Sequence, residues 1–118
     1  GKVDMYMVTH HGLPSSNNPV LVRAIAPRVA VMCNGPTKGG SESVLKTLGE
    51  CKSLKALYQL HRNVKLDPAL QTPANYIANG GTTEGCEGVW VKARVAPGGK
   101  SYTVQIGPKG VPRRFKSR

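Results

Sequence analysis

The sequence has few acidic and few aromatic residues, and it has no long hydrophobic run. Six Asp and Glu stand against 17 Lys and Arg, and the aromatic residues are one Trp, one Phe and four Tyr. No segment approaches the ~20 apolar residues of a membrane-spanning helix, and the first residues lack the pattern of a signal peptide. We therefore expect no membrane segment in this chain. The scarcity of aromatics disfavours a surface that stacks nucleic-acid bases.

The cysteines, Cys33, Cys51 and Cys86, form no recognisable pattern. Their number is odd and no two have C-x-x-C spacing, so the sequence predicts neither a disulfide framework nor a zinc knuckle. Cys33 ends the apolar run VAVMC, and Cys51 shares the apolar face of a predicted helix. Both are expected to be buried, unreactive thiols. Cys86 lies in a Gly-rich segment and has no predicted role.

Length and composition predict one small domain with a modest core. The chain has 118 residues, of which 39% are hydrophobic, and its 14 Gly and 9 Pro predict many turns. It starts with Gly rather than Met, and a strand-like run begins at residue 5. We therefore expect the chain to be a piece of a longer protein.

Two apolar runs around a short helix predict a βαβ unit. Residues 5–9 and 28–33 are apolar at consecutive positions, which is typical of strands buried on both faces. The segment between them predicts a helix with Asn18 as its N-cap, Pro19 at its first position and Pro27 at its end. Strand, helix and strand within about thirty residues predict parallel strands.

The rest of the chain predicts one more helix, a third strand and an antiparallel hairpin. Residues 41–52 predict a helix capped by Ser41, and residues 54–62 predict the third strand. Residues 63–87 predict a long loop, and residues 88–107 alternate as a hairpin with one face on a core. The expected α/β unit is one mixed layer of strands covered by two helices. The apolar face of the second helix comprises Val44, Leu45, Leu48 and Cys51.

The net charge of +11 favours anionic partners, and nucleic acid is the usual one. Basic residues are scattered through the middle of the chain and concentrate only in PKGVPRRFKSR, residues 108–118, which is typical of a solvated terminus. A small basic α/β module that binds nucleic acid or another polyanion is therefore the alternative function. Its affinity would be salt-sensitive, and it would depend on Arg113, Arg114, Lys116 and Arg118.

Polar side chains follow the predicted parallel strands at the edge where such sheets collect ligands. Gly12 lets the backbone turn tightly beside the His10-His11 pair. A histidine at a strand end is more often a hydrogen-bonded structural residue than a ligand. One metal needs three or four ligands, and Asp4 lies a strand length away, so the residues alone build no closed metal site. The side chains expected at this edge are those of His10, His11, Ser15, Ser16, Asn34 and Lys38, with His61 nearby.

The segment VDMYMVTHHGLPSSNNPVLVRAIAPRVAVMCNGP, residues 3–36, resembles the carboxyl-terminal part of metallo-β-lactamase-fold hydrolases. The nearest branch is the ComEC-like one, which includes the hydrolase domain of that DNA-uptake protein. LYQLHR, YIAN and EGVWVKARVAPGGKSYTVQIG also resemble the end of soluble bacterial members, so the similarity covers nearly the whole chain. The matching features, in order, are a strand, His10-His11-Gly12, Ser16, Pro19, PRVAV and the helix-opening SESVLKTL.

The resemblance implies an αββα sandwich that holds one or two metal ions, usually Zn²⁺. His10 matches the late His ligand at a strand end. The metal would activate water for attack on an ester, phosphoester or amide, with a small molecule or a phosphoester as substrate. Neighbours of the metal, or side chains that face the substrate, are then His11, Ser16, Asn34 and Lys38.

Several features of the family are absent from this chain. The early His-x-His-x-Asp-His motif, a middle His and a bridging Asp would lie upstream, in the missing amino-terminal half of the domain, so the chain alone is expected to be inactive. The two helices cover only one face of the strands, and a sheet from that missing half is expected on the other. KGGSES replaces a frequent His-Pro, and we expect Gly39 and Gly40 to shape a loop that presents Lys38 to an anionic substrate. A family member that lost its metal and kept the fold is a further alternative.

Overall fold

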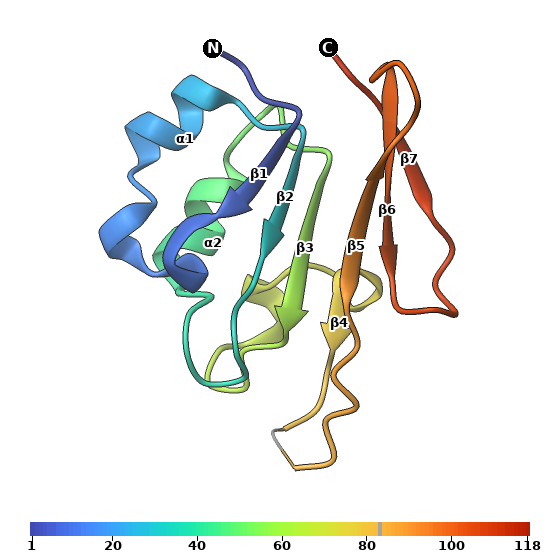
Figure 1. Cartoon of the computed structure of the whole chain (residues 1–118). Helices are drawn as coiled ribbons and strands as arrows, with labels where there is room; N and C mark the ends of the chain where they lie inside the picture. The colour runs from blue at the N-terminus through green and yellow to red at the C-terminus, as the bar shows by residue number, and fades with distance from the viewer. Residues whose placement is uncertain (83) are drawn as a thin grey trace.

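Over residues 1–82 and 84–118, which the structure describes, the computed structural model is a mixed α/β fold with two sheets (Figure 1). The parallel sheet has the order β1-β2-β3-β4, and the antiparallel sheet has the order β5-β6-β7. The parallel strands are β1 (Met5–Val8), β2 (Val29–Met32), β3 (Ala56–His61) and β4 (Ile77–Asn79). The antiparallel strands are β5 (Val91–Val95), β6 (Ser101–Ile106) and β7 (Arg113–Lys116).

Helices α1 (Pro19–Ile25) and α2 (Glu42–Gly49) lie on one face of the parallel sheet (Figure 1). The Asn18 side chain accepts a hydrogen bond from the backbone N–H of Val20 at 2.8 Å, which confirms the predicted N-cap. Ser41 occupies the N-cap position of α2, but its side chain makes no capping bond, contrary to expectation. The predicted apolar face of α2 is buried together with Val22, Ala30 and Met32.

The antiparallel sheet packs on the other face of the parallel sheet. Val29 and Val31 of β2 and Tyr58 of β3 form a second core cluster with Tyr102 and Val104 of β6. The prediction of one mixed strand layer is therefore wrong, because the one-sided hairpin packs on the parallel sheet instead of joining it. The sheet that covers β2 also comes from this chain, so no missing half is needed for that purpose. All four residues of β2 are buried.

Strand β1 is less covered than its sequence predicts. Among the described strands it pairs with β2 alone, at the edge of the parallel sheet. Met5 reaches the core between the sheets, whereas Met7, two positions along, is 58% exposed. Burial on both faces is thus confirmed for β2 and wrong for β1, since the antiparallel sheet does not extend over Met7.

Two strands were missed by the sequence patterns. The predicted loop 63–87 contains 3₁₀ turns at Pro68–Leu70 and Ala74–Tyr76 and the three-residue strand β4; residue 83 of that loop lies outside the described residues. The basic segment that predicted a solvated terminus contains β7, which pairs with β6 along its whole length. Phe115 of β7 stacks on Tyr102 at 5.5 Å between ring centroids, and this packing fixes the strand.

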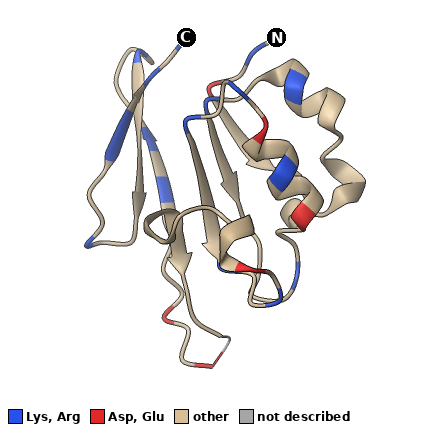
Figure 2. Ribbon diagram, turned by 180° about the vertical axis from the view of Figure 1, so that it is seen from behind, with Lys and Arg blue, Asp and Glu red and all other residues tan. Residues whose placement is uncertain are grey.

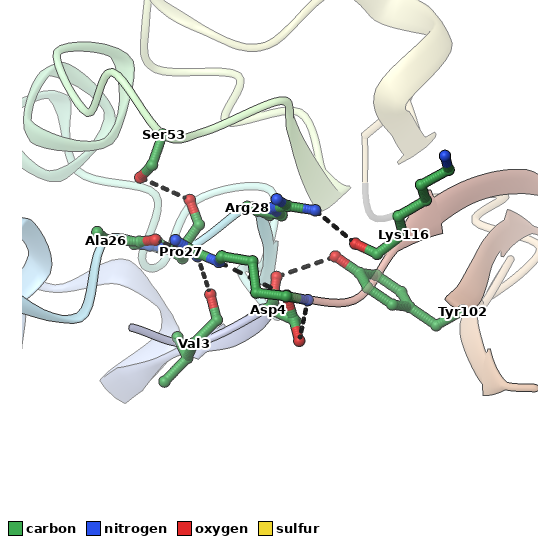
Figure 3. Close-up of polar contacts among 9 residues, drawn as sticks. Val3, Asp4, Ala26, Pro27, Arg28, Ser53, Tyr102 and Lys116 are labelled. Carbon is green, nitrogen blue, oxygen red and sulfur yellow. Dashed lines mark hydrogen bonds and ion pairs between the residues drawn. The ribbon is translucent and has the colours of Figure 1, made fainter. Parts of the chain in front are cut away.

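Polar contacts join the two sheets at the edge opposite the carboxyl ends of the parallel strands (Figure 3). The carboxylate of Asp4 accepts a hydrogen bond from the backbone N–H of Arg118 at 3.1 Å and lies 3.6 Å from its guanidinium. The Tyr102 hydroxyl donates to the backbone carbonyl of Asp4 at 3.0 Å, and Arg28 donates to that of Lys116 at 2.7 Å. We call these five residues the terminal clasp.

Within the described residues, neither helix has the length and apolarity required to cross a membrane.

Candidate functional site

The chain makes a left-handed turn directly after β1. His10, His11 and Gly12 have φ values of 48°, 55° and 79°. For residues other than glycine this region costs about 1–2 kcal/mol each, because Cβ approaches the following carbonyl. Two consecutive histidines in this conformation therefore store strain that the surrounding structure must offset. The sequence predicted a tight turn through Gly12 and gave no sign that both histidines share its backbone conformation.

The loop that precedes α2 holds the histidine turn in place. The backbone N–H of Gly40 donates to the carbonyl of His11 at 2.8 Å, and the N–H of Ser41 donates to that of Gly12 at 3.0 Å. A Cβ atom on Gly39 would lie 2.0 Å from the carbonyl oxygen of His11. Only glycine permits this approach, so the expected role of Gly39 and Gly40 in shaping a loop at this edge is confirmed.

The ring of His10 is exposed and is oriented by the serines that follow it. Its Nδ1 lies 3.1 Å from the Ser15 hydroxyl and 3.5 Å from that of Ser16. With Nδ1 engaged by a hydroxyl, Nε2 is the nitrogen directed away from these neighbours. The predicted proximity of Ser16 is therefore observed, with Ser15 as the closer partner.

The ring of His11 faces a different neighbour. Its Nδ1 lies 2.8 Å from the backbone carbonyl of Cys33, so Nδ1 carries a proton and donates. The two imidazole centroids are 6.4 Å apart. Cys33 itself is exposed, and its thiol lies 3.6 Å from the Met7 sulfur. The expectation of a buried thiol is wrong at this position because Cys33 lies just beyond the end of β2; Cys51 is buried as expected.

Asn34 and Lys38, predicted beside the metal or facing the substrate, have different environments. Asn34 is 1% exposed, and its amide donates to the backbone carbonyls of His61 at 2.7 Å and Gly35 at 3.1 Å. It therefore joins the ends of β2 and β3 beneath the edge. Lys38 is exposed, and its backbone carbonyl closes the loop by accepting from Gly35 at 2.8 Å.

His61 ends β3 at the same edge but contacts the far side of it. Its Nε2 lies 3.9 Å from the Cys86 thiol, and its Nδ1 is buried with no hydrogen-bond partner in the part of the chain that the structure describes. Asp4 lies at the other end of β1, in the terminal clasp. Over the described residues, no three His, Cys, Asp or Glu side chains are grouped so that they could hold one metal ion.

Asn17 is a supporting residue that the sequence did not reveal. It is 3% exposed, and its amide donates to the carbonyls of Thr9 at 2.9 Å and Leu13 at 2.7 Å. Its side-chain oxygen accepts from the Tyr6 hydroxyl at 2.8 Å. Asn17 thus bonds both ends of the histidine turn. The only sequence signal is the pair NNP, in which Asn18 accounts for the cap and leaves Asn17 without an evident role.

Comparison of the chain with protein-family models, with curated proteins and with solved structures finds no match.

Proposed function

We propose that this chain is the carboxyl-terminal part of a metallo-β-lactamase-fold hydrolase of the ComEC-like type, in which His10 supplies one metal ligand. The observation that carries the proposal is the strained turn at His10 and His11. Strain of this kind persists only where neighbouring structure over-determines it, and it clusters at functional sites. Glycine adopts the left-handed conformation at lower cost, so the presence of histidine at these positions supports a role for the imidazole side chains.

The environment of His10 suits a ligand held through Nε2. A hydroxyl partner on Nδ1 orients the ring and can accept the Nδ1 proton that ligation through Nε2 requires. His10 accounts for one ligand, and the others would come from the amino-terminal half of the domain. A Zn²⁺ ion held there would supply hydroxide near neutral pH for attack on an ester, phosphoester or amide.

The neighbouring residues support this assignment in different ways. Gly39 and Gly40 hold the turn, Asn34 secures the strand ends below it, and exposed Lys38 would attract an anionic substrate to the same edge. His11 donates to a backbone carbonyl through Nδ1, so Nε2 is the ring nitrogen left to face substrate or water. The uncovered Met7 side of β1 would adjoin the missing half of the sandwich.

The coding sequence upstream of Gly1 provides the first test. We expect a His-x-His-x-Asp-His motif at some distance and an Asp at a strand end shortly before Lys2. A reading frame that lacks both features contradicts the proposal.

The protein encoded by that longer frame provides the second test. His10→Ala should lower its metal content, measured by mass spectrometry after dialysis, and abolish hydrolysis of a phosphodiester such as bis(p-nitrophenyl) phosphate. His61→Ala is the matched control, because His61 lies at the same edge beside Cys86 and should leave the metal in place. Equal metal loss in both variants would mean that His10 has no special role.

Lys38→Ala should raise KM for the anionic substrate about threefold to tenfold with little change in kcat, and an unchanged KM would remove Lys38 from the site.

A further inference from the structure

The charged residues in the last part of the chain, residues 88–118, are all basic. Residues 88–118 contain eight Lys and Arg and no Asp or Glu, whereas the whole chain has 17 basic and six acidic residues. These residues form the antiparallel sheet and its turns. Figure 2 shows the basic segments along β5 and β7 and the acidic segments elsewhere in the molecule. Most of the net positive charge therefore lies on this part of the chain, which carries +8 of the net charge of +11.

The register of the strands places four cations on the outer face of the sheet. Alternate residues of β6, Tyr102 and Val104, are buried against the parallel sheet, so their neighbours in sequence face outward. Thr103 on that outer side pairs with Arg94 of β5 and with Arg114 of β7, which forms one row across the sheet. By the same alternation Lys92 and Lys116 also face outward. We call the outer side that carries Lys92, Arg94, Arg114 and Lys116 the basic face.

These cations form a track rather than a cluster. Lys92 lies two residues before the row of Arg94 and Arg114, and Lys116 lies two residues beyond it on the opposite strand. With ~3.3 Å per residue and ~4.8 Å between strands, the line from Lys92 to Lys116 is ~16 Å long. Hydroxyl and amide side chains of β6 lie along its middle. Such a line matches the repeating charges of a polyanion backbone better than it matches a single compact anion.

The basic face differs from the basic terminus that the sequence suggested. Arg113 points to the inner side, where its guanidinium donates to the Tyr76 hydroxyl at 2.6 Å and lies 4.3 Å from the ring centroid. The guanidinium of Arg118 donates to the backbone carbonyls of Val3 and Ala26. Arg113 and Arg118, two of the four terminal residues predicted to bind a polyanion, thus make contacts within the folded chain instead. The strand cations Lys92 and Arg94 take their place.

One exposed aromatic residue lies at the end of the track. Trp90 precedes β5 by one residue, is 39% exposed, and has the Lys92 ammonium 4.9 Å from its ring centroid. The contact places the indole on the same side as Lys92. An indole beside a line of cations is the arrangement by which proteins bind a nucleic-acid strand whose bases are free to stack.

We infer that the basic face binds single-stranded nucleic acid, with Trp90 stacking on a base and the four cations tracking the phosphates. Charge complementarity identifies the partner as a polyanion, and the ~16 Å track accommodates about four nucleotides. The bases of a duplex are not open to Trp90. Along its strands the outer side carries polar and basic side chains, and the Trp90 indole beside them is too small an apolar area for a protein to enter a lipid surface or to be covered by a helix. The inference does not depend on the proposed metal site.

Fluorescence anisotropy of a labelled twenty-residue oligothymidylate tests this inference with the 118-residue chain. The affinity should fall with salt, with a log–log slope of about −3 for four phosphate contacts. Lys92→Glu with Arg94→Glu should weaken binding at least tenfold. The matched control is Lys46→Glu with Lys52→Glu, which makes the same charge change at exposed positions in and after α2 and should weaken binding less than threefold. Circular dichroism establishes that both variants remain folded.

Trp90 allows a second measurement, which tests base stacking separately from the contacts between the cations and the phosphates. Its fluorescence should be quenched by the oligothymidylate, and Trp90→Ala should weaken binding about fivefold or more at every salt concentration. Equal losses in the two double variants, or no effect of Trp90→Ala, would overturn the inference. Equal affinity for a duplex of the same length would also overturn the inference, and so would tighter binding to vesicles with anionic lipid. Neither of these partners offers Trp90 a free base on which to stack.

Discussion

Two turns with nearly the same backbone conformation differ in what surrounds them. Gly39, beside the histidine turn, has a φ of 77°, and Gly98, in the hairpin between β5 and β6, has a φ of 78°. A Cβ atom would lie 2.0 Å from a backbone oxygen at Gly39 and would have no atom within 4 Å at Gly98. Contacts with neighbouring segments therefore require glycine in the turn at the edge of the parallel sheet, whereas in the hairpin of the antiparallel sheet only the backbone conformation favours glycine.

Gly39→Ala should produce the largest effect, because it adds a backbone clash to an unfavourable φ. We expect the free energy of unfolding to fall by about 4 kcal/mol, measured by urea denaturation. Gly98→Ala, with the same φ and open space, should lose only about 1 kcal/mol. Similar losses at both positions would mean that the histidine turn is no more constrained by packing than the hairpin.

Tyr58 lies between the two sheets, and the pH dependence of stability that it contributes reports how closely the sheets pack around its hydroxyl. It is 1% exposed, its hydroxyl has no hydrogen-bond partner among the described residues, and burial raises its pKa to about 12. Above pH 10 the unfolded chain loses the phenolic proton more readily than the folded one, so stability should fall as the pH rises from about 10 to about 12. The expected contribution of Tyr58 to that loss is about 2 kcal/mol.

Tyr58→Phe isolates this contribution. The variant should gain about 1 kcal/mol near neutral pH, because it removes an unpaired buried hydroxyl, and its stability should decline less steeply in alkali. Chemical denaturation between pH 7 and pH 12 measures both quantities. Identical alkaline slopes for the variant and the native chain would indicate that the sheets separate enough to solvate Tyr58.

His10→Gly tests whether the histidine turn stores strain. Relief of the left-handed conformation, less the entropy that glycine adds to the unfolded chain, should raise the free energy of unfolding by about 0.5–1 kcal/mol. His61→Gly, in the extended backbone of β3, should lower it, since glycine weakens strands. Thermal unfolding of both variants gives the comparison. A loss of stability in His10→Gly would show that the imidazole stabilises the fold.

Asp4→Asn should have the smallest effect. The Asp4 and Arg118 side chains are 30% and 24% exposed, so solvent screens their ion pair, and asparagine can still accept the backbone bond. We expect a loss of about 0.5 kcal/mol that disappears in 1 M salt. Glu50→Gln, in the more exposed pair with Arg23, should change nothing measurable. A larger loss in Asp4→Asn would mean that the clasp governs docking of the sheets.

The sequence predicted the elements that carry strong local signals. Asn18 and Pro19 defined the start of α1, and the βαβ unit and the hairpin followed from their apolar patterns. β4 was missed because three residues are too few to show a period. β7 was missed because its alternation consists of basic residues around a single Phe115, and the partner that buries that ring is distant in sequence.

The candidate site was predictable in its place and not in its geometry. Apolar strands that end in His10 and Asn34 indicated the edge of the sheet. The left-handed conformation of His10 and His11 could not be predicted, because histidine disfavours it and the loop that enforces it lies nearly thirty residues away. The supporting role of Asn17 and the exposure of Cys33 likewise depend on contacts between distant segments.

The terminal clasp also determines how the molecule responds to mechanical load. The two ends of the chain lie side by side (Figure 1), and the clasp joins residues 114 positions apart. A force that separates the ends acts first on the clasp and then peels the antiparallel sheet away, one contact after another. A pull on the amino terminus then reaches β1, the edge strand of the parallel sheet, which leads into the histidine turn. The clasp, at the opposite edge from that turn, therefore stands between the applied force and the strand that carries the two histidines.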